Sequence, residues 1–250
     1  MADRTSSEDD RRPGRTVGFR PLYRQVRDMF EQRIAEGTWA AGQILPSEMQ
    51  LASELSVSQG TVRKALDEMT ADNILVRRQG RGTYVASHDE KRILFQFFKL
   101  TPDDGPLRFP DSVVTEAVRR VALPSERDRL GLTGTDEVVA IERTRSLSGE
   151  PVLVERIVAP ADALPGIEIG EIPNNLYGLY SERYGVVVVR AQEKLKAVAA
   201  GPREAAALGV PEGTPLLAID RLAWSVDGRP IEWRVSMCLT DRHHYLSDLK

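Results

Sequence analysis

Residues 45–85 read LPSEMQLASELSVSQGTVRKALDEMTADNILVRRQGRGTYV, and this stretch decides the fold of the N-terminal part of the chain. Ser47 is followed three residues later by Gln50, which is the capping-box pattern at the start of a helix. Apolar residues recur at helical spacing on both sides of Val57. Two short runs rich in β-branched residues then flank a basic, glycine-containing tip at 77–82. The stretch therefore predicts a helix, a tight turn, a second helix and a β-hairpin.

A further helix precedes this stretch. Pro21 can begin it and Gly37 can end it, and its apolar residues form one stripe at helical spacing. Residues 1–18 are polar and mixed in charge, so we expect a disordered tail there. Together these patterns predict a winged helix-turn-helix domain over residues 19–87.

A helix-turn-helix places the start of its second helix in the major groove of DNA. Arg63 lies there and can donate two hydrogen bonds to guanine, while Gln59 could pair with adenine. Arginines at a narrow hairpin tip suit a minor groove or phosphates. An alternative is that these charged side chains form only a solvated face. The candidate DNA-contacting residues are Ser47, Gln59, Gly60, Thr61, Arg63, Lys64, Arg78, Gly80, Arg81 and Gly82.

The overall charge limits how the protein could bind DNA. The chain carries a formal net charge of −3, so it is not a polycation. Within residues 20–87 nine basic residues stand against eight acidic ones, but five of the nine lie in the second helix and the hairpin. We therefore expect a local basic patch.

Composition also points to a compartment. A lone cysteine, Cys238, cannot form an internal disulfide and fits a reducing cytoplasm. No apolar run is long enough to span a membrane, and no signal peptide is recognisable. We expect a cytoplasmic protein without a membrane partner.

Strand patterns dominate residues 111–250, which we expect to form an α+β domain with an antiparallel sheet. Residues 124–143 resemble residues 202–221 at a constant offset of 78. Each copy reads as helix, strand, turn, strand, and two such halves would build one pseudo-symmetric sheet. Residues 88–110 form a linker, whose apolar patch could be dimer surface or ordinary core. That patch comprises Ile93, Leu94, Phe95, Phe97 and Phe98.

Two arginines on a predicted strand are the best candidates for ligand binding. Arg143 and Arg145 share a face with apolar residues, so they should point inward. Two buried guanidinium groups need partners. A bound phosphate or carboxylate would satisfy them, and an internal salt bridge with Glu155 or Glu232 would do so equally well.

The N-terminal stretch resembles the GntR family of bacterial transcription regulators. The matching residues are Leu45-Pro46-Ser47-Glu48, Leu51-Ala52, Val57-Ser58, Thr61-Val62-Arg63-Lys64-Ala65-Leu66 and Gly80-Arg81-Gly82-Thr83-Tyr84-Val85. The family often has DNA-contacting arginines at the positions of Met49 and Gln59. Their replacement puts the family's usual half-site in question for this chain.

The C-terminal half resembles the UTRA ligand-binding domain of HutC-like GntR regulators, which has a chorismate-lyase-like fold. The resembling segments are Arg143-x-Arg145, Gly149-Glu150-Pro151, Leu176-Tyr177, Tyr184-Gly185, Asp227-Gly228-Arg229-Pro230-Ile231-Glu232 and Asp241-Arg242. The resemblance implies an effector site formed by Arg143, Arg145, Asn175, Tyr177, Glu232 and Cys238. Asn175 and Cys238 replace the serine and tyrosine common in members that bind sugar phosphates, which argues against simply assigning an amino-sugar phosphate.

The resemblance implies a homodimeric transcription regulator at the bacterial nucleoid, most often a repressor, with double-stranded operator DNA and a small-molecule effector as partners. The rival hypotheses are a ligand sensor that acts through protein contacts and a chorismate-lyase-like enzyme. We expect no enzyme activity, because no nucleophile–base arrangement or phosphate loop is recognisable. We also expect no cofactor and no metal site, because the chain has three histidines and His243 and His244 would point to opposite faces of an extended segment.

Overall fold

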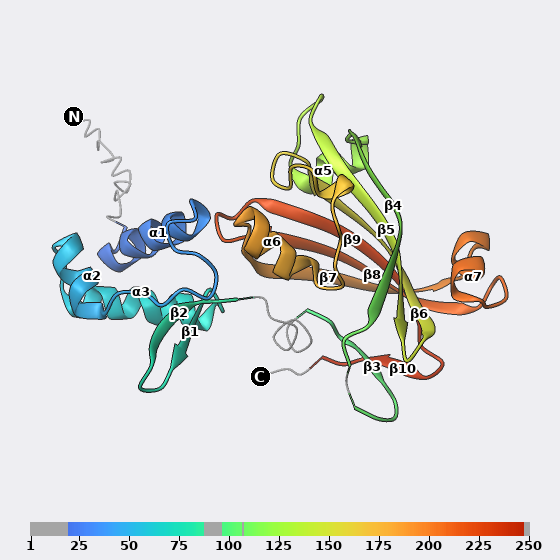
Figure 1. Cartoon of the computed structure of the whole chain (residues 1–250), viewed down its shortest axis with the longest axis horizontal. Coiled ribbons are helices and arrows are strands. Elements are labelled where there is room, and N and C mark those ends of the chain that lie inside the picture. The colour runs from blue at the N-terminus through green and yellow to red at the C-terminus, as the bar shows by residue number, and fades with distance from the viewer. Residues whose placement is uncertain (1–19, 88–96, 107, 248–250) are drawn as a thin grey trace, which may run out of the picture.

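The computed structural model describes residues 20–87, 97–106 and 108–247, and these form a helical N-terminal part and a C-terminal part built on a large sheet (Figure 1). The predicted tail at 1–18 lies outside the described residues. The N-terminal elements are α1 (Leu22–Ala35), α2 (Glu48–Leu55), α3 (Gln59–Ala71), β1 (Leu75–Arg78) and β2 (Gly82–Val85). They confirm the predicted winged helix-turn-helix.

Local sequence signals explain where α2 and α3 begin and end. Ser47 caps α2 and forms the capping box with Gln50. Ser56 adopts a left-handed conformation that ends α2, and Ser58 then caps α3 by accepting a hydrogen bond from the backbone of Thr61. The apolar faces of the helices meet in one core, whose largest fully buried side chains are Phe30, Ile34, Leu51, Leu66, Met69 and Leu75.

The C-terminal part is a six-stranded antiparallel sheet with the strand order β4-β5-β6-β9-β8-β7. The fold class is therefore α+β, as predicted. The strands are β4 (Asp111–Val121), β5 (Glu137–Leu147), β6 (Glu150–Pro160), β7 (Val188–Ala199), β8 (Pro215–Ser225) and β9 (Pro230–Leu239). The helices are α5 (Pro124–Leu130), η1 (Ile167–Ile169), α6 (Leu176–Tyr184) and α7 (Pro202–Leu208).

The predicted internal repeat is confirmed. The first half runs β4, α5, β5, β6 and the second runs β7, α7, β8, β9, so that β6 and β9 meet at the centre of the sheet. The register agrees with the repeat, because the Glu142–Arg156 pair of β5 and β6 corresponds to the Asp220–Val235 pair of β8 and β9. The two halves are thus structurally equivalent.

The two faces of the sheet carry different elements. The face that we call inner packs against α6 and η1, through residues such as Ile141 and Ile157. The outer face packs against α5 and α7, which lie on β9 and β6 respectively. Because side chains alternate along a strand, neighbouring residues of β5 belong to different faces: Arg143 to the inner and Glu142 to the outer.

The predicted linker contains a short strand. Leu100–Pro102 forms a short strand, β3, that pairs with β10 (His243–Tyr245). Phe97 and Phe98 are buried against the C-terminal part, so for these two residues the core alternative is correct. Ile93, Leu94 and Phe95 lie outside the described residues. No helix in the described part of the chain is both long and apolar enough for a membrane span.

The two parts of the chain are also in contact. Val187 and Val226 belong to the same buried cluster as the core of α1, α2 and α3. They lie at the ends of β7 and β8, and the backbone N–H of Val226 donates to the carbonyl of Val187 at 2.9 Å. This end of the sheet therefore supports the N-terminal helices.

Candidate DNA-binding surface and effector site

The N-terminal end of α3 presents the residues expected of a reading surface. Gln59, Gly60, Arg63 and Lys64 are exposed and Thr61 is partly exposed. The Ser58 hydroxyl accepts from the backbone N–H of Thr61 at 3.1 Å and lies 2.8 Å from its hydroxyl. Lys64 is held to one side, because its ammonium lies 4.0 Å from the ring centre of Tyr23 on α1.

An acidic residue of α2 holds the candidate reading side chains together. Glu48 pairs with Arg63, whose Nε and Nη2 both lie 2.9 Å from Oε2. The amide of Gln59 donates to the same oxygen at 3.3 Å, and Arg77 of the wing lies 3.5 Å from Oε1. The hydrogen bond from Arg63 lowers the pKa of Glu48 below its ordinary value. Sequence reasoning missed this role of Glu48, because an acidic residue at the start of a helix is expected there for its favourable charge alone.

The wing is an exposed hairpin whose tip depends on glycine. Gly80 and Gly82 have φ angles of +68° and +104°, which side-chain-bearing residues rarely adopt. Arg78 stacks on the ring of Tyr84 at 4.6 Å, and Arg81 is exposed at the tip. Arg78, Gly80, Arg81 and Gly82 therefore lie together on one projecting loop.

Ser47, which caps α2, and Met49, in its first turn, contribute differently to this surface. The backbone N–H of Gln50 donates to the Ser47 hydroxyl at 3.3 Å, so Ser47 has a structural role whether or not it also contacts DNA. Met49 is 70% exposed beside the same surface. A thioether there has no strong donor, so this position cannot contribute the guanidinium hydrogen bonds that an arginine would.

The inner face of the sheet carries a buried cluster of charges. Arg143 is 2% exposed and pairs with Glu155, so the internal salt bridge that the sequence offered as one alternative is formed for this residue. Ser236 donates to Glu155 at 3.2 Å, and Arg234 lies 3.5 Å away. Burial alone would raise the pKa of Glu155, but the surrounding arginines hold it well below its ordinary value.

Glu232 is not the partner of Arg143. It is fully buried and accepts hydrogen bonds from the hydroxyls of Tyr177 and Tyr180, both at 3.0 Å. Arg234 donates to both of its carboxylate oxygens, at 3.0 and 2.8 Å. Glu232 thus fixes Tyr177 and Arg234 rather than either predicted ligand-binding arginine.

Arg145 is the least satisfied group of the cluster. It is 3% exposed, and Nη2 donates to the carbonyl of Pro110 at a long 3.4 Å. Its Nε is buried without a hydrogen-bond partner among the described residues. The guanidinium lies beside the adjacent rings of Phe98 and Phe109, at 5.1 and 4.9 Å from their centres. Burial lowers the pKa of Arg145 from 12.5 to about 9, so it remains charged at neutral pH.

Most of the predicted effector residues meet around two small adjoining cavities. Arg143, Arg145, Asn175 and Tyr177 line the first, and Cys238 lines the second together with Arg145. Each cavity measures about 20 Å³, which is room for one water molecule and not for a metabolite. Phe97, Phe98 and Phe109 close the first cavity. Glu232 lies behind this site and reaches it only through Tyr177 and Arg234.

Asn175 and Cys238 have clear structural roles. The side chain of Asn175 caps α6 by accepting from the backbone N–H of Gly178 at 2.9 Å. Cys238 is fully buried in an apolar cluster, and burial raises the pKa of its thiol. The thiol therefore stays protonated, as expected for a small strand residue.

Sequence reasoning also missed Arg221 and Arg234 in this cluster. Arg221 pairs with Glu193 at 2.5 Å and donates to the carbonyl of Phe97. The internal repeat was the signal that could have found Arg221, because it occupies the position of Arg143 in the second half.

Comparison with known proteins agrees with both halves of this description. Residues 108–244 match the UTRA domain family, and residues 22–85 match the family of bacterial regulatory proteins named gntR. The chain is 29% identical over 234 residues to the mannosyl-D-glycerate transport/metabolism system repressor MngR of Escherichia coli (strain K12), covering 92% of this chain and 96% of that protein. It is 30% identical over 210 residues to the histidine utilization repressor of Pseudomonas putida, covering 83% and 84%.

A solved structure supports the assignment of the C-terminal part. The ligand-binding domain of a GntR-family transcriptional regulator from Bordetella bronchiseptica is 35% identical, covers 62% of this chain and 98% of its own, and superposes with a TM-score of 0.57. Its match, the two family matches and the two repressors all indicate a regulator rather than an enzyme. The chain therefore belongs to the GntR family of bacterial transcription regulators, in the HutC-like branch that joins a winged helix-turn-helix to a UTRA domain.

Proposed function

We propose that this protein is a cytoplasmic, homodimeric repressor whose operator affinity is controlled by a small anion bound at Arg143 and Arg145. Two recognition helices would enter successive major grooves of a near-palindromic operator, roughly 34–36 Å apart. The observation that carries the effector assignment is the state of Arg145, a buried charge with one long hydrogen bond and an unpartnered Nε.

The chemistry of the cavity supports an anion. Arg143 is already matched by Glu155, whereas no carboxylate lies within ion-pair distance of Arg145 among the described residues. A phosphate or carboxylate beside Arg145 would receive charge-assisted hydrogen bonds in a place that excludes water. One relative is named for the transport and metabolism of mannosyl-D-glycerate, whose glycerate group is a carboxylate.

The closed cavity implies that a segment must move when the effector binds. Phe98 and Phe109 cover the guanidinium of Arg145, and both lie in the segment that follows the DNA-binding domain in the chain. Displacing these rings would shift this segment, and with it the placement of the DNA-binding domain. The effector could change operator affinity only by as much as it prefers one of the two states.

Sequence-specific binding would rest on α3. Arg63 is the exposed arginine best placed for a guanine edge, and the Arg78–Arg81 tip is suited to phosphates or a minor groove. On DNA, Arg63 can keep part of its contact with Glu48 while the rest of its guanidinium turns to a base. The protein would act at the nucleoid, where its operator lies.

Fluorescence anisotropy on the DNA upstream of its own gene tests the DNA part of the proposal. Arg63→Ala should reduce operator affinity by roughly ten- to hundredfold, as expected for a loss of ~1–3 kcal/mol, and should change nonspecific binding little. Arg119→Ala is the matched control, since Arg119 is a half-exposed arginine of β4 paired with Glu137. Equal loss on operator and random DNA would mean that Arg63 contacts only phosphate.

A thermal-shift screen of phosphorylated and carboxylated metabolites tests the effector part. A true effector should raise the melting temperature of the wild type and change its operator affinity, and Arg145→Met should lose both responses while still binding the operator. An effector response that survives in this variant would remove Arg145 from the site. Light scattering at micromolar concentration should report a dimer, and a monomer would contradict the palindromic arrangement.

A further inference from the structure

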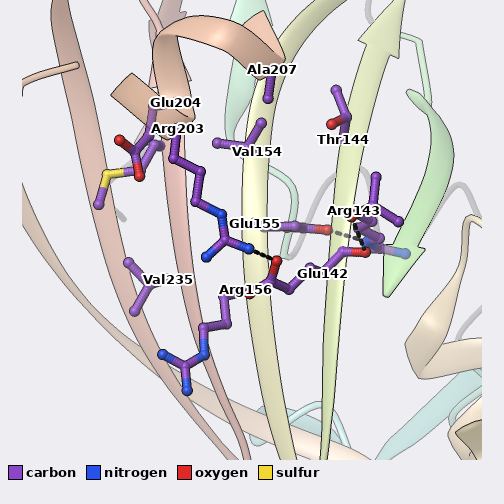
Figure 2. A pocket seen from close by; sticks show the side chains of 12 residues that line it. Glu142, Arg143, Thr144, Val154, Glu155, Arg156, Arg203, Glu204, Ala207 and Val235 are labelled. Carbon is purple, nitrogen blue, oxygen red and sulfur yellow. Dashed lines mark hydrogen bonds and ion pairs between the residues drawn. The ribbon is translucent and has the colours of Figure 1, made fainter. Parts of the chain in front are cut away.

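The outer face of the sheet holds a second hollow, which lies on the side of β5 and β6 that faces α7 and is also lined by Arg143 and Glu155 of the charge cluster. We call it the α7 hollow, and its walls include Glu142, Val154, Arg156, Arg203, Ala207 and Met237. Its volume of about 470 Å³ is in the range of sites for small molecules. Figure 2 shows Arg203 reaching across from α7 to Glu142, with Ala207 and Val154 beside it.

The equivalent place under α5, where this helix packs on β9, is filled. Under α5 the guanidinium of Arg129 lies 5.5 Å from the ring centre of Trp233 and pairs with Asp220 Oδ2. The indole N–H of Trp233 donates to the other oxygen of Asp220, Oδ1, at 2.9 Å. Here a flat aromatic ring and a cation together occupy the space between helix and sheet.

The internal repeat relates these residues to the α7 hollow position by position. At the offset of 78, Ala207 stands where Arg129 stands in the first half, and Glu142 corresponds to Asp220. The strand register completes the match, because the Thr144–Val154 pair corresponds to the Leu222–Trp233 pair. The α7 hollow therefore keeps the carboxylate and lacks both large side chains.

The charge at Glu142 is already balanced. Arg203 pairs with its Oε2, as Arg129 pairs with Oδ2 of Asp220. What the α7 hollow lacks relative to the space under α5 is the indole, which combines a flat apolar surface with one N–H donor. The aliphatic side chains of Val154, Met237 and Ala207 remain as surface for such a ring.

From this asymmetry we propose that the α7 hollow is a second small-molecule site, which binds a neutral, flat aromatic compound with an N–H donor directed at Glu142. The ring would occupy the place equivalent to that of Trp233 under α5, and its N–H would donate to Oε1 of Glu142. Arg143 lines both this hollow and the cavity beside Arg145, but the contact proposed here is with Glu142 on the outer face. It would stand even if the anionic effector did not.

Indole is the probe that tests this proposal, and benzofuran is its matched control, since an oxygen replaces the N–H in a ring of the same shape. Ligand-observed NMR titration of the full chain should give an indole dissociation constant on the order of 1 mM, as expected for a ligand of this size. Benzofuran should bind about fivefold more weakly, because the partly buried carboxylate of Glu142 loses this donor.

Two variants fill the hollow from different elements. Val154→Trp on β6 and Ala207→Arg on α7 copy the side chains found under α5, Trp233 and Arg129, and each should weaken indole binding at least about tenfold. Leu195→Trp is the control, since it adds the same side chain at a half-exposed position of β7 and should leave binding unchanged. Circular dichroism checks each fold, and a misfolded variant leaves the other to decide.

Several results would overturn the proposal. These are no indole binding to the wild type up to about 10 mM, undiminished binding in a folded filling variant, or benzofuran binding as tightly as indole. If the wild type does not bind indole and Val154→Trp alters the oligomeric state in light scattering, a second copy of the chain binds at the hollow instead.

Discussion

Replacing Arg145 by methionine is expected to make the free protein more stable, although Arg145 is a buried arginine in a ligand-binding domain. The inner-face cluster holds four arginines against three glutamates, namely Arg143, Arg145, Arg221 and Arg234 against Glu155, Glu193 and Glu232. Arg145 is the arginine in excess. Methionine has a similar length and can pack against Phe98 and Phe109 without a charge.

The size of the effect follows from the desolvation of Arg145. Burial lowers its pKa from 12.5 to about 9, and each pKa unit corresponds to ~1.4 kcal/mol between the charged and neutral forms. The charge therefore costs several kcal/mol at neutral pH. Methionine leaves the carbonyl of Pro110 without its donor and removes an attraction to Glu155, so we expect a net gain of about 1–3 kcal/mol.

Arg143→Met is the matched control, because it makes the same change two residues away on the same face. It removes the partner of Glu155 and leaves that carboxylate less compensated, so it should destabilise the protein by about 3–5 kcal/mol. Urea unfolding followed by circular dichroism measures both variants at pH 7. If Arg145→Met destabilises the protein as much as Arg143→Met does, Arg145 is an integral member of the ion-pair network and the reasoning fails.

Three further predictions concern other parts of the molecule. Glu48→Gln should reduce the ratio of operator to nonspecific DNA affinity about tenfold, since Arg63 loses the carboxylate that orients it. Glu54→Gln, the same change at a residue paired with Arg33, should leave this ratio unchanged. Fluorescence anisotropy at two salt concentrations measures the ratio for both variants. The pKa of Glu155 is lowered in the folded state, so its contribution to stability should be complete above the ordinary value of 4.5 and be lost as the pH falls below it. Urea unfolding midpoints, measured roughly every half pH unit between pH 3 and 6, should fall more steeply with decreasing pH for the wild type than for Glu155→Gln. Gly82→Ala should destabilise the wing by ~1–3 kcal/mol, because φ is +104° and a Cβ would lie 3.2 Å from Ile44, whereas Gly80→Ala, with open space around it, should cost less in thermal unfolding and in DNA affinity.

Local signals made the N-terminal domain predictable. The caps at Ser47 and Ser58, the left-handed turn before Val57 and the glycines of the wing each act within a few residues. The predicted helices and strands of the C-terminal part also match the structure, because alternation along a strand and the turns at Ser148-Gly149 and Asp227-Gly228 are local as well. The repeat in the sequence also predicted the pseudo-symmetry of the sheet.

The contacts that define the candidate sites were not predictable in the same way. Glu48 meets Arg63 and Arg77 across 15 and 29 residues of sequence, and no local pattern records such a meeting. The closure of Arg145 by Phe98 and Phe109 depends on how the segment before β4 crosses the sheet. The sequence indicated that Arg143 and Arg145 need partners. Only the structure showed that Arg143 pairs with a carboxylate whereas Arg145 has no carboxylate partner among the described residues.

The sequence by itself thus determined the family, the two domains, the face on which Arg143 and Arg145 lie and the equivalence of the two halves. These follow from hydrophobic periodicity and helix capping, which act over a few residues, and from a repeat that can be recognised in the amino-acid sequence. The tertiary structure alone decided that Glu155 pairs with Arg143, that each cavity beside Arg145 has room for only one water molecule and that the space under α7 is open where the space under α5 is full. Each of these depends on which distant side chains reach the same volume, and that is fixed only when the whole sheet is assembled.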